Sequence, residues 1–505
     1  MMTMKHFRPA LIATSLLAAC PATPGETTVG TETTDGEEST DTTNGEDSQS
    51  TPVDPTTSAG TTTNSTVDSE SESMSGPNTD PSTSSSTGPG VECGADDECA
   101  GDTPFCSADG ACVACDGAPD PDAACRSVGE NVCVAGECHE CTVDGGQCSG
   151  STPACDPDSL SCVGCFDHAH CPDSACNYET GVCNDISYVL YVDRLAADCM
   201  AGDGTMALPY CKVTEALTRT ADEPGASWTI KVRAGNYLED ALVIPASALI
   251  TMIGWEGIPR LRALDGDNPT LLINLDAKVY LDHLQFASNT VAEGVKCEGG
   301  TVWADDVKFT ANKLAGYKST DCTSTFNRSV FFDNDGGGVA SYGVGTTTII
   351  SSYITGNGTQ NSGDFGGIRT AQENQLHLIY STVLNNLSKS GPRSLHCDVD
   401  AFPAEVRNSV IIAFAAPSVD CASGVFSNSV LDEGSMAADI LVATMADIEN
   451  YFEPMTEGVY KAKPGTLMQD VAMWADGDPK TDYNLQARPN TDGALDWPGA
   501  DIPDE

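Results

Sequence analysis

Charged side chains of two kinds recur near the middle of the chain, at positions that a repeating pattern would bring together. They are Asp282, Asp305, Asp306, Lys308 and Arg328. Carboxylate oxygens are the ligands that calcium prefers, and a Lys or Arg within hydrogen-bond reach of a proton can serve as a base. Taken one by one, these residue types could hold a calcium ion or exchange a proton. The same charges also suit a solvated face without any chemistry.

The elements that would position these charges form a pattern recurring from about Lys278 to Glu433. Six segments alternate apolar and polar residues as strands do. They align on Leu284, Val307, Val330, Tyr353, Thr382 and Val410, with spacings of 23, 23, 23, 29 and 28 residues. A weaker copy follows at 426–431. Such a period is typical of a solenoid, whose repeats bury their apolar faces against their neighbours. We predict an all-β fold, a right-handed parallel β-helix.

This alignment assigns side chains to the inside and the outside of the coils. The inward positions are Leu284, Val307, Val330 and Tyr353, together with Phe286, Phe309 and Phe332. One outward column holds Asp282, Asp305 and Arg328, and the next holds His283, Asp306 and Ser329. The following turn carries Asn289, Asn312, Asn334, Asp335 and Asn357. Stacked amides at a turn can hydrogen-bond from coil to coil, so we predict a structural ladder there.

The residues before the coils resemble the opening of pectin-lyase-like β-helix proteins. Gly202-Asp-Gly-Thr205 and Pro209-Tyr-Cys211 precede a helix predicted over 213–220, and a strand ending in Ala234-Gly-Asn-Tyr237 follows. In that family the helix covers the open end of the stack, because an uncovered first coil exposes strand edges. The resemblance implies one β-helix domain over 185–505, with this cap and a C-terminal closing segment.

Members of that family that cleave acidic polysaccharides pair Asp-bound calcium with a basic residue. The resemblance therefore offers Asp305, Asp306, Lys308 and Arg328 as catalytic candidates, and Asp282, Asp305 and Asp306 as calcium ligands. The polygalacturonase pattern of separated Asp pairs with Gly-His-Gly is absent from this sequence. No other cofactor is predicted.

The net charge of the chain limits the kinds of molecule that it can bind. The chain of 505 residues carries 24 Lys and Arg against 74 Asp and Glu, a formal net charge of −50. Nucleic acid is excluded as a partner, since phosphate binding needs a basic surface. A polyuronate would also be repelled unless a metal ion or local basic residues intervened.

The 23 cysteines indicate an oxidising compartment. Sixteen of them form four sets of four between Cys93 and Cys183, and a Cys-x-x-Cys joins each set to the next. Four cysteines allow three connectivities, and we expect the first to pair with the third and the second with the fourth. The expected pairs are Cys93–Cys106, Cys99–Cys112, Cys115–Cys133, Cys125–Cys138, Cys141–Cys155, Cys148–Cys162, Cys165–Cys176 and Cys171–Cys183.

Zinc is the competing interpretation of the Cys-x-x-Cys pairs, and export argues against it. The units at 91–184 resemble Dickkopf-like cysteine-rich repeats of exported bacterial proteins, which implies a spacer or protein-contact module. Three further bridges are predicted in the β-helix: Cys199–Cys211, Cys297–Cys322 and Cys397–Cys421.

The amino terminus has the pattern of an export signal. Lys5 and Arg8 precede a short apolar run that ends in Leu17-Ala-Ala-Cys20. The last four residues resemble the lipobox of bacterial lipoproteins, which implies removal of residues 1–19 and lipid on Cys20. An ordinary secretory signal is the alternative. Residues 20–90 are rich in Ser, Thr, Asp and Glu, and we expect a disordered linker because they cannot bury a core.

Taken together, these features predict a monomeric lipoprotein of a bacterial outer membrane or cell surface, anchored in the membrane through lipid. Its β-helix is expected to bind a glycan or another surface protein without catalysis. The first alternative is a polysaccharide lyase or glycoside hydrolase acting on acidic glycans. The second is a rigid spacer.

Overall fold

The computed structural model describes residues 104–504 except 144, 265–266, 360–364, 390–393, 414–417 and 433–439, together with Cys93, Ala95, Asp96 and Cys99. Contacts divide the chain into two units, Met1–Ser85 and Ser86–Glu505, and the described residues belong to the second. The predicted signal peptide, the lipid site at Cys20 and the whole of the predicted linker lie outside the described residues. No described helix is long and apolar enough to cross a membrane.

Each cysteine-rich unit is built around a two-stranded antiparallel ribbon. The ribbons are β1 (Phe105–Cys106) with β2 (Cys112–Val113), β3 (Val132–Val134) with β4 (Glu137–His139), β5 (Ala154–Cys155) with β6 (Cys162–Val163), and β7 (Cys176–Asn177) with β8 (Val182–Cys183). The helices are η2 (Cys115–Gly117), α1 (Pro121–Ser127), η3 (His168–His170) and η4 (Ile186–Tyr188). Few apolar side chains are buried, so the cystines form most of each core.

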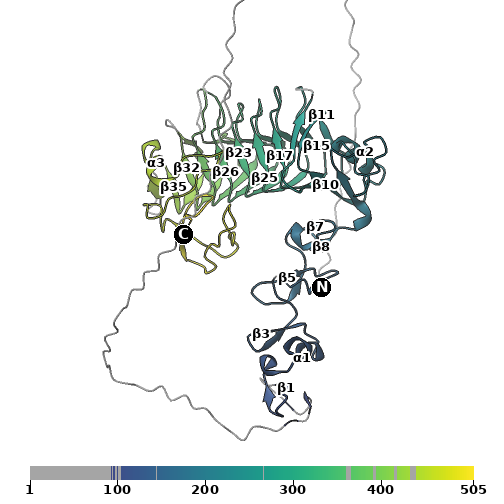
Figure 1. Cartoon of the computed structure of the whole chain (residues 1–505). Coiled ribbons are helices and arrows are strands. Elements are labelled where there is room, and N and C mark those ends of the chain that lie inside the picture. Colours follow the sequence, from purple (N-terminus) through teal and green to yellow (C-terminus); the bar gives the residue numbers. More distant parts are fainter. Residues whose placement is uncertain are drawn as a thin grey trace, which may run out of the picture. The chain divides into compact units, whose positions relative to one another are not determined.

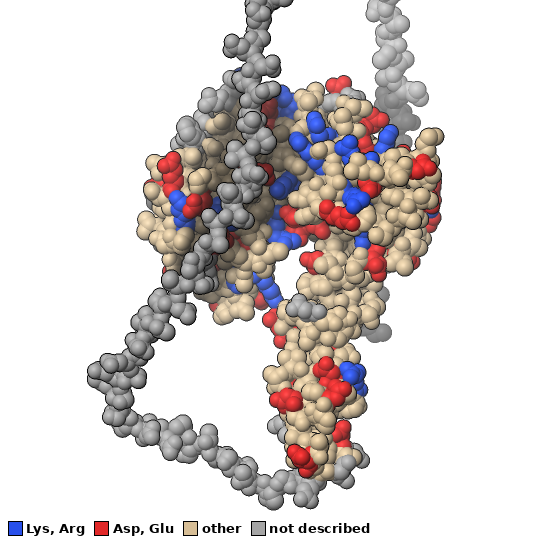
Figure 2. All heavy atoms as spheres, in the orientation of Figure 1, with Lys and Arg blue, Asp and Glu red and all other residues tan. Residues whose placement is uncertain are grey.

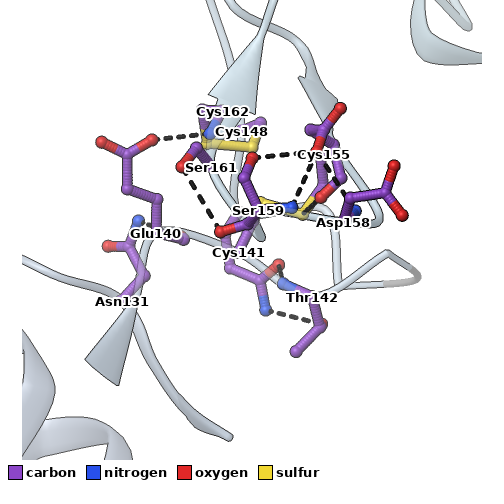
Figure 3. The surroundings of a disulfide bond; sticks show 12 residues. Asn131, Glu140, Cys141, Thr142, Cys148, Cys155, Asp158, Ser159, Ser161 and Cys162 are labelled. Atoms are coloured by element: carbon purple, nitrogen blue, oxygen red, sulfur yellow. Dashed lines mark hydrogen bonds between the residues drawn. A yellow bond between two sulfur atoms is a disulfide. The ribbon is translucent and has the colours of Figure 1, made fainter. Parts of the chain in front are cut away.

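The cysteines are bonded as first with third and second with fourth in all four units, the same pairs that we expected. The zinc interpretation is wrong, because these thiols are consumed in disulfides. Figure 3 shows how one unit holds the next: the Glu140 carboxylate accepts a hydrogen bond of 2.6 Å from the backbone N–H of Cys162. The three bridges predicted in the β-helix, at 199–211, 297–322 and 397–421, are also present.

Residues from Val189 onward form a parallel β-helix, as predicted, with three parallel sheets of ten, ten and eight strands (Figure 1). The first sheet contains β9 (Val189–Val192), β10 (Ser227–Arg233), β13 (Leu249–Trp255), β16 (Lys278–Asp282), β19 (Thr301–Asp305), β22 (Thr323–Asn327), β25 (Gly345–Ile350), β28 (Asn374–Ile379), β31 (Glu405–Arg407) and β34 (Val425–Ser427).

The second and third sheets complete each coil. The second contains β11 (Asn236–Glu239), β14 (Arg260–Ala263), β17 (Gln285–Ala287), β20 (Lys308–Thr310), β23 (Val330–Phe332), β26 (Tyr353–Thr355), β29 (Thr382–Leu384), β32 (Val410–Ile412), β35 (Ser429–Leu431) and β36 (Ile440–Val442). The third contains β12 (Leu242–Ile244), β15 (Leu271–Ile273), β18 (Val295–Glu298), β21 (Tyr317–Thr320), β24 (Val339–Tyr342), β27 (Ile368–Thr370), β30 (Leu395–Cys397) and β33 (Val419–Asp420).

A sharp corner joins the first sheet to the second in seven consecutive coils. One residue with positive φ makes each corner: His283, Asp306, Arg328, Ser351, Tyr380, Asn408 and Asn428. This left-handed conformation turns the chain within a single residue, and it is easier for Asn, Asp and His than for most side chains. The corner matters for the site because it carries two of the predicted charges, Asp306 and Arg328.

Three ladders fill the interior of the stack. Phe309 stacks on Phe331 with ring centroids 4.5 Å apart. In the serine ladder, each hydroxyl oxygen accepts a hydrogen bond from a backbone N–H on the preceding coil; the serines are Ser329, Ser352, Ser381 and Ser409. The predicted amide ladder is present as Asn289, Asn312, Asn334, Asn357 and Asn386, each accepting from or donating to its neighbour. Asn334, not Asp335, therefore occupies the ladder position.

The predicted register is wrong by one residue from the third coil onward. Asp282 pairs with Asp305, 23 residues apart, but Asp305 pairs with Asn327, 22 residues apart. Arg328 therefore shares the corner column with His283 and Asp306, and Phe331 takes the inward place assigned to Phe332. Apolar periodicity could not resolve this, because Val330, Phe331 and Phe332 are all apolar.

The two ends of the stack are covered. Helix α2 (Val213–Thr220) buries Val213, Ala216 and Leu217 against the first coils, as the cap prediction requires. The carboxylate of Glu239 accepts hydrogen bonds from the backbone N–H groups of Val213 and Thr214, at 2.8 and 2.9 Å. This carboxylate satisfies donors that a helix start leaves free.

The C-terminal segment covers the outer face of the second sheet. It contains η5 (Met445–Asp447), α3 (Ile448–Tyr451), β37 (Ala472–Met473) and β38 (Leu495–Asp496). Val330 and Tyr353 face this segment, and the Tyr353 hydroxyl donates to the Tyr460 carbonyl at 3.0 Å. Their predicted inward orientation is wrong. They are buried because the segment folds over them.

Candidate functional site

A pocket of about 290 Å³ lies between the first sheet and the fourth cysteine-rich unit. One wall comes from η3 and the strands after it, and the other from β16, β19 and β22. The lining residues are Phe166, His168, Tyr178, Tyr280, Leu281, Trp303, Ala304, Asp305, Thr325 and Asn327. Both aromatic and hydrogen-bonding side chains therefore face the same space.

The aromatic wall follows from the coil register. Tyr280 and Trp303 are partners on adjacent strands, so their rings stack with centroids 4.7 Å apart and an interplanar angle of 8°. Tyr178 meets Tyr280 from the cysteine-rich unit at 5.4 Å, and His168 packs on Tyr178 at 4.9 Å. Burial lowers the pKa of His168 to about 4, so its ring is neutral at physiological pH.

Polar contacts fasten the cysteine-rich wall to the coils. Lys278 Nζ lies 2.6 Å from the Glu179 carboxylate, and Lys231 Nζ donates to the Pro172 carbonyl at 2.6 Å. The Asn184 amide donates to the Thr229 hydroxyl at 3.2 Å. These contacts lie on either side of Tyr178 in the sequence, so they hold its ring against Tyr280.

The polar wall centres on Asp305. Its carboxylate accepts two hydrogen bonds from the Arg328 guanidinium, at 2.9 and 2.6 Å, and one from the Asn327 amide at 3.1 Å. Burial lowers the pKa of Arg328, but its hydrogen bond to Asp305 and the charges of Asp305 and Asp306 outweigh burial and raise it. Arg328 is therefore a fixed cation.

Asp282 lies one coil from Asp305 in the same outward column. Its carboxyl has no side-chain hydrogen bond within the described part of the chain. Burial raises its pKa to about 7, and the charges of Asp305, Asp167 and Asp306 add to this, while Arg328 acts in the opposite direction. Near neutral pH this carboxyl can therefore hold or release a proton.

Two predicted residues lie away from the pocket. Asp306 sits on the corner, where its carboxylate lies 2.6 Å from Nδ1 of His283. Lys308 begins β20 in the second sheet, and its Nζ lies 3.8 Å from the Glu457 carboxylate. The structure thus brings Asp282, Asp305 and Arg328 together and separates Lys308 from them.

These residues do not fit a calcium site. Among the described residues, sets of three potential ligand atoms within 4.8 Å of one another occur only among disulfide-bonded cysteines. Asp305 is engaged by Arg328, and Asp306 by His283. We therefore derive no chemistry through calcium.

Sequence reasoning missed the aromatic wall. Tyr280 and Trp303 stand 23 residues apart, one coil, so two aromatic residues at one outward position were a usable signal. Nothing local marks Phe166 or Tyr178, because their role depends on how a separate module packs against the coils.

Comparisons with known proteins give the following matches. Residues 78–189 match a family of unknown function, DUF8331. No curated protein matches the chain. Among solved structures, the chain is similar to pectate lyase Pel9A, with 10% identity, a TM-score of 0.32 and coverage of 63% of this chain and 96% of that one.

Two esterases are also similar. The pectin methylesterase from Aspergillus niger has 12% identity and a TM-score of 0.24, covering 51% of this chain and 85% of that one. The rice weevil pectin methyl esterase has 10% identity and a TM-score of 0.21, covering 47% of this chain and 78% of that one.

Proposed function

We propose that the protein binds a saccharide in the pocket between the fourth cysteine-rich unit and the first sheet, without cleaving it. The observation that carries this proposal is the stacked pair Tyr280 and Trp303 beside the hydrogen-bonding groups of Asp305 and Asn327. A sugar ring presents an apolar C–H face and a rim of hydroxyls. Aromatic walls with a few placed polar groups suit both features.

Binding is favoured over lyase chemistry by the state of the charged groups. A lyase base must accept a proton, but Arg328 donates two hydrogen bonds to Asp305 and its pKa is raised. The other predicted base, Lys308, belongs to the second sheet. Neither residue is poised to remove a proton from a sugar in this pocket.

The proposed place of action is a bacterial outer membrane or cell surface, with the protein held by lipid on Cys20. The support is the signal pattern that ends in Leu17-Ala-Ala-Cys20. Mass spectrometry of the protein isolated from its membrane should find a lipid-modified Cys20 as the first residue. An unmodified thiol at Cys20 would contradict the anchor and leave the pocket proposal untouched.

A glycan array probed with the full chain tests the binding proposal. We expect a restricted set of saccharides to bind, and Trp303→Ala to lose them. Phe402→Ala is the matched control, because Phe402 is an exposed ring elsewhere on the coils. Equal binding by wild type and Trp303→Ala would refute the pocket. If no saccharide on the array binds, the result would favour binding of a protein partner or a role as a rigid spacer.

Glycoside hydrolysis is the second candidate, and the pair Asp282 and Asp305 favours it over lyase chemistry. Neighbouring coils lie about 4.8 Å apart, close to the carboxyl separation of about 5 to 5.5 Å in retaining glycosidases. Asp282 has a pKa of about 7 and could donate a proton, while Asp305 is paired with Arg328. Three hydrogen bonds to Asp305 oppose this role, because they weaken it as a nucleophile.

Activity assays separate these candidates. Saccharides found by the array should yield no new reducing ends and no ultraviolet absorbance from unsaturated products, with or without calcium. New reducing ends that disappear in Asp282→Asn would establish the hydrolase. Unsaturated products that disappear in Arg328→Ala would establish the lyase.

A further inference from the structure

A second surface, on the coils near the N-terminal cap, carries two cations, Arg260 and Arg262, for which the described residues supply no acidic partner. Arg260 and Arg262 stand two positions apart on β14, so both side chains project from the same face of the second sheet. No carboxylate of the described residues lies within ion-pair distance of either. This is unexpected in a chain with a net charge of −50.

Other cations on the coils, unlike Arg260 and Arg262, form ion pairs with carboxylates of the described residues. Arg233 pairs with Asp193 at 2.9 Å, and Lys313 with Asp335 at 2.6 Å. The protein has about three times as many acidic as basic residues, so a shortage of carboxylates does not explain why Arg260 and Arg262 have no ion-pair partner among the described residues. The arrangement leaves two guanidinium groups available to a ligand.

The neighbouring coils add compatible groups. Arg260 aligns with Gln285, which aligns with Lys308, so these residues form one outward column. Coils lie about 4.8 Å apart, which places the Lys308 backbone about 10 Å from that of Arg260. One guanidinium NH2 group of Arg260 donates to the Ser288 hydroxyl at 2.5 Å. Among the described residues, the buried Nε atoms of Arg260 and Arg262 find no hydrogen-bond partner.

A cavity of about 290 Å³ adjoins Arg262. Ser288, Asn289 and Thr290 line it on one side, and Lys313 reaches it from the next turn. Asp333 and Asp335 also line it, and Lys313 neutralises Asp335. An anion would therefore sit toward Arg262, with hydroxyl and amide groups left to bind a sugar ring. Figure 2 shows Lys and Arg side chains gathered over the coils labelled β11 and β17 in Figure 1.

We infer that this surface, Arg260 and Arg262 with the adjoining cavity, binds an anionic sugar unit through its carboxylate or sulfate group. Guanidinium groups bind such planar or tetrahedral oxyanions through paired hydrogen bonds. The strong negative charge of the rest of the chain opposes an anionic membrane or a highly charged polymer. A saccharide with a single anionic residue can bind the local cations and is repelled much less by the negative charge of the rest of the chain. This site lies on the second sheet and does not depend on the aromatic pocket.

Calorimetric titration of the full chain tests the inference with three probes: an oligogalacturonate, a sulfated oligosaccharide and a neutral galactose oligomer. We expect one or both anionic probes to bind, the neutral oligomer not to bind, and added salt to weaken binding. Arg260→Gln with Arg262→Gln should lower affinity by about tenfold or more. Whether the carboxylated or the sulfated probe binds identifies the anion.

Matched variants make the result specific. Arg126→Gln with Lys212→Gln removes the same charge from exposed positions and should leave affinity unchanged. Trp303→Ala should also bind the anionic probe as wild type does, which separates this site from the aromatic pocket. Thermal unfolding verifies that each variant is folded. The inference is overturned if no anionic probe binds, if the neutral oligomer binds as tightly as the anionic probes, or if the Arg260 and Arg262 variant binds as wild type does.

Discussion

Asp282, next to the pocket-lining Leu281, has no cation paired with its carboxyl group among the described residues. Asp305 beside it has a bidentate Arg328, whereas Asp282 has burial and neighbouring carboxylates, which raise its pKa to about 7. Two acidic residues in equivalent positions of successive coils thus differ because the corner residue that approaches Asp305 is a cation. Because the pKa of Asp282 is raised in the folded protein, the free energy of unfolding should depend on pH.

Asp282→Asn should flatten that dependence. The pKa of Asp282 is about 7 in the folded protein and near its ordinary 3.8 when unfolded, so the folded state binds the proton more tightly. Its stabilising contribution is complete below pH 4 and is lost as pH rises toward 7. After allowance for solvent screening, we expect Asp282→Asn to stabilise the protein by on the order of 1 to 2 kcal/mol at pH 8, and little at pH 4.

Denaturant unfolding at the two pH values measures this effect. Asp240→Asn, which removes an exposed carboxylate, provides the baseline. An Asp282→Asn curve parallel to that of wild type between pH 4 and pH 8 would show that Asp282 is ionised without cost in the folded protein.

At this scale the sequence could identify the charges but not their partners. The period placed Asp282 and Asp305 in one column correctly, since their spacing is 23 residues. The family resemblance grouped Lys308 with them as a catalytic candidate, although three residues beyond Asp305 the chain has turned the corner into the second sheet. A single left-handed residue makes that corner, and hydrophobic periodicity does not reveal its position.

Among the elements, the amide ladder is the device that fixes the register of the coils. Asn334 accepts from the Asn312 side chain, and it donates to the Phe309 carbonyl and to the Asn357 side chain. All of these groups are buried and have no water to replace a lost partner. A buried polar group left unsatisfied costs about 1 to 3 kcal/mol.

Asn334→Ala should therefore lower the free energy of unfolding by about 2 to 4 kcal/mol, because it orphans groups on two coils. Asn490→Ala, at an exposed asparagine, should change it by less than about 0.5 kcal/mol. Denaturant titration of both variants measures the difference. Loss of the same small amount in each would mean that the ladder adds nothing to the stability of the stack.

The sequence predicted these elements unevenly. Period and alternation identified the coils, and cysteine spacing was consistent with the bonded pairs. The cover on the second sheet was missed, because the segment after Leu441 has no period, and its burial of Val330 and Tyr353 depends on contacts more than 100 residues apart in sequence.

At the scale of the whole molecule, disulfides and coils stabilise their parts in different ways. The cysteine-rich units bury little besides their cystines, whereas the β-helix has a continuous apolar core. Each bridge that closes a loop of 11 to 18 residues contributes about 3 kcal/mol. The wall that carries Tyr178 therefore depends mainly on its disulfides, whereas the wall that carries Trp303 is held mainly by the apolar core of the coils, with one bridge, Cys297–Cys322, beside it.

Mild reduction should abolish saccharide binding at the aromatic pocket while the β-strand signal in circular dichroism persists. Alkylation and mass spectrometry identify the bridges that have opened, and glycan binding is measured on the same sample. Binding retained after the Cys165–Cys176 and Cys171–Cys183 bridges are alkylated would show that the fourth unit is not part of the site.

The central claim is that two modules, a cysteine-rich unit and the coil stack, form one binding site. Titration of the saccharide found by the array against wild type and Tyr178→Ala tests it most directly, because Tyr178 belongs to the unit and meets Tyr280 at 5.4 Å. The account predicts a loss of affinity of about tenfold or more. Tyr178→Ala binding as tightly as wild type, while Trp303→Ala is impaired, would contradict a shared site.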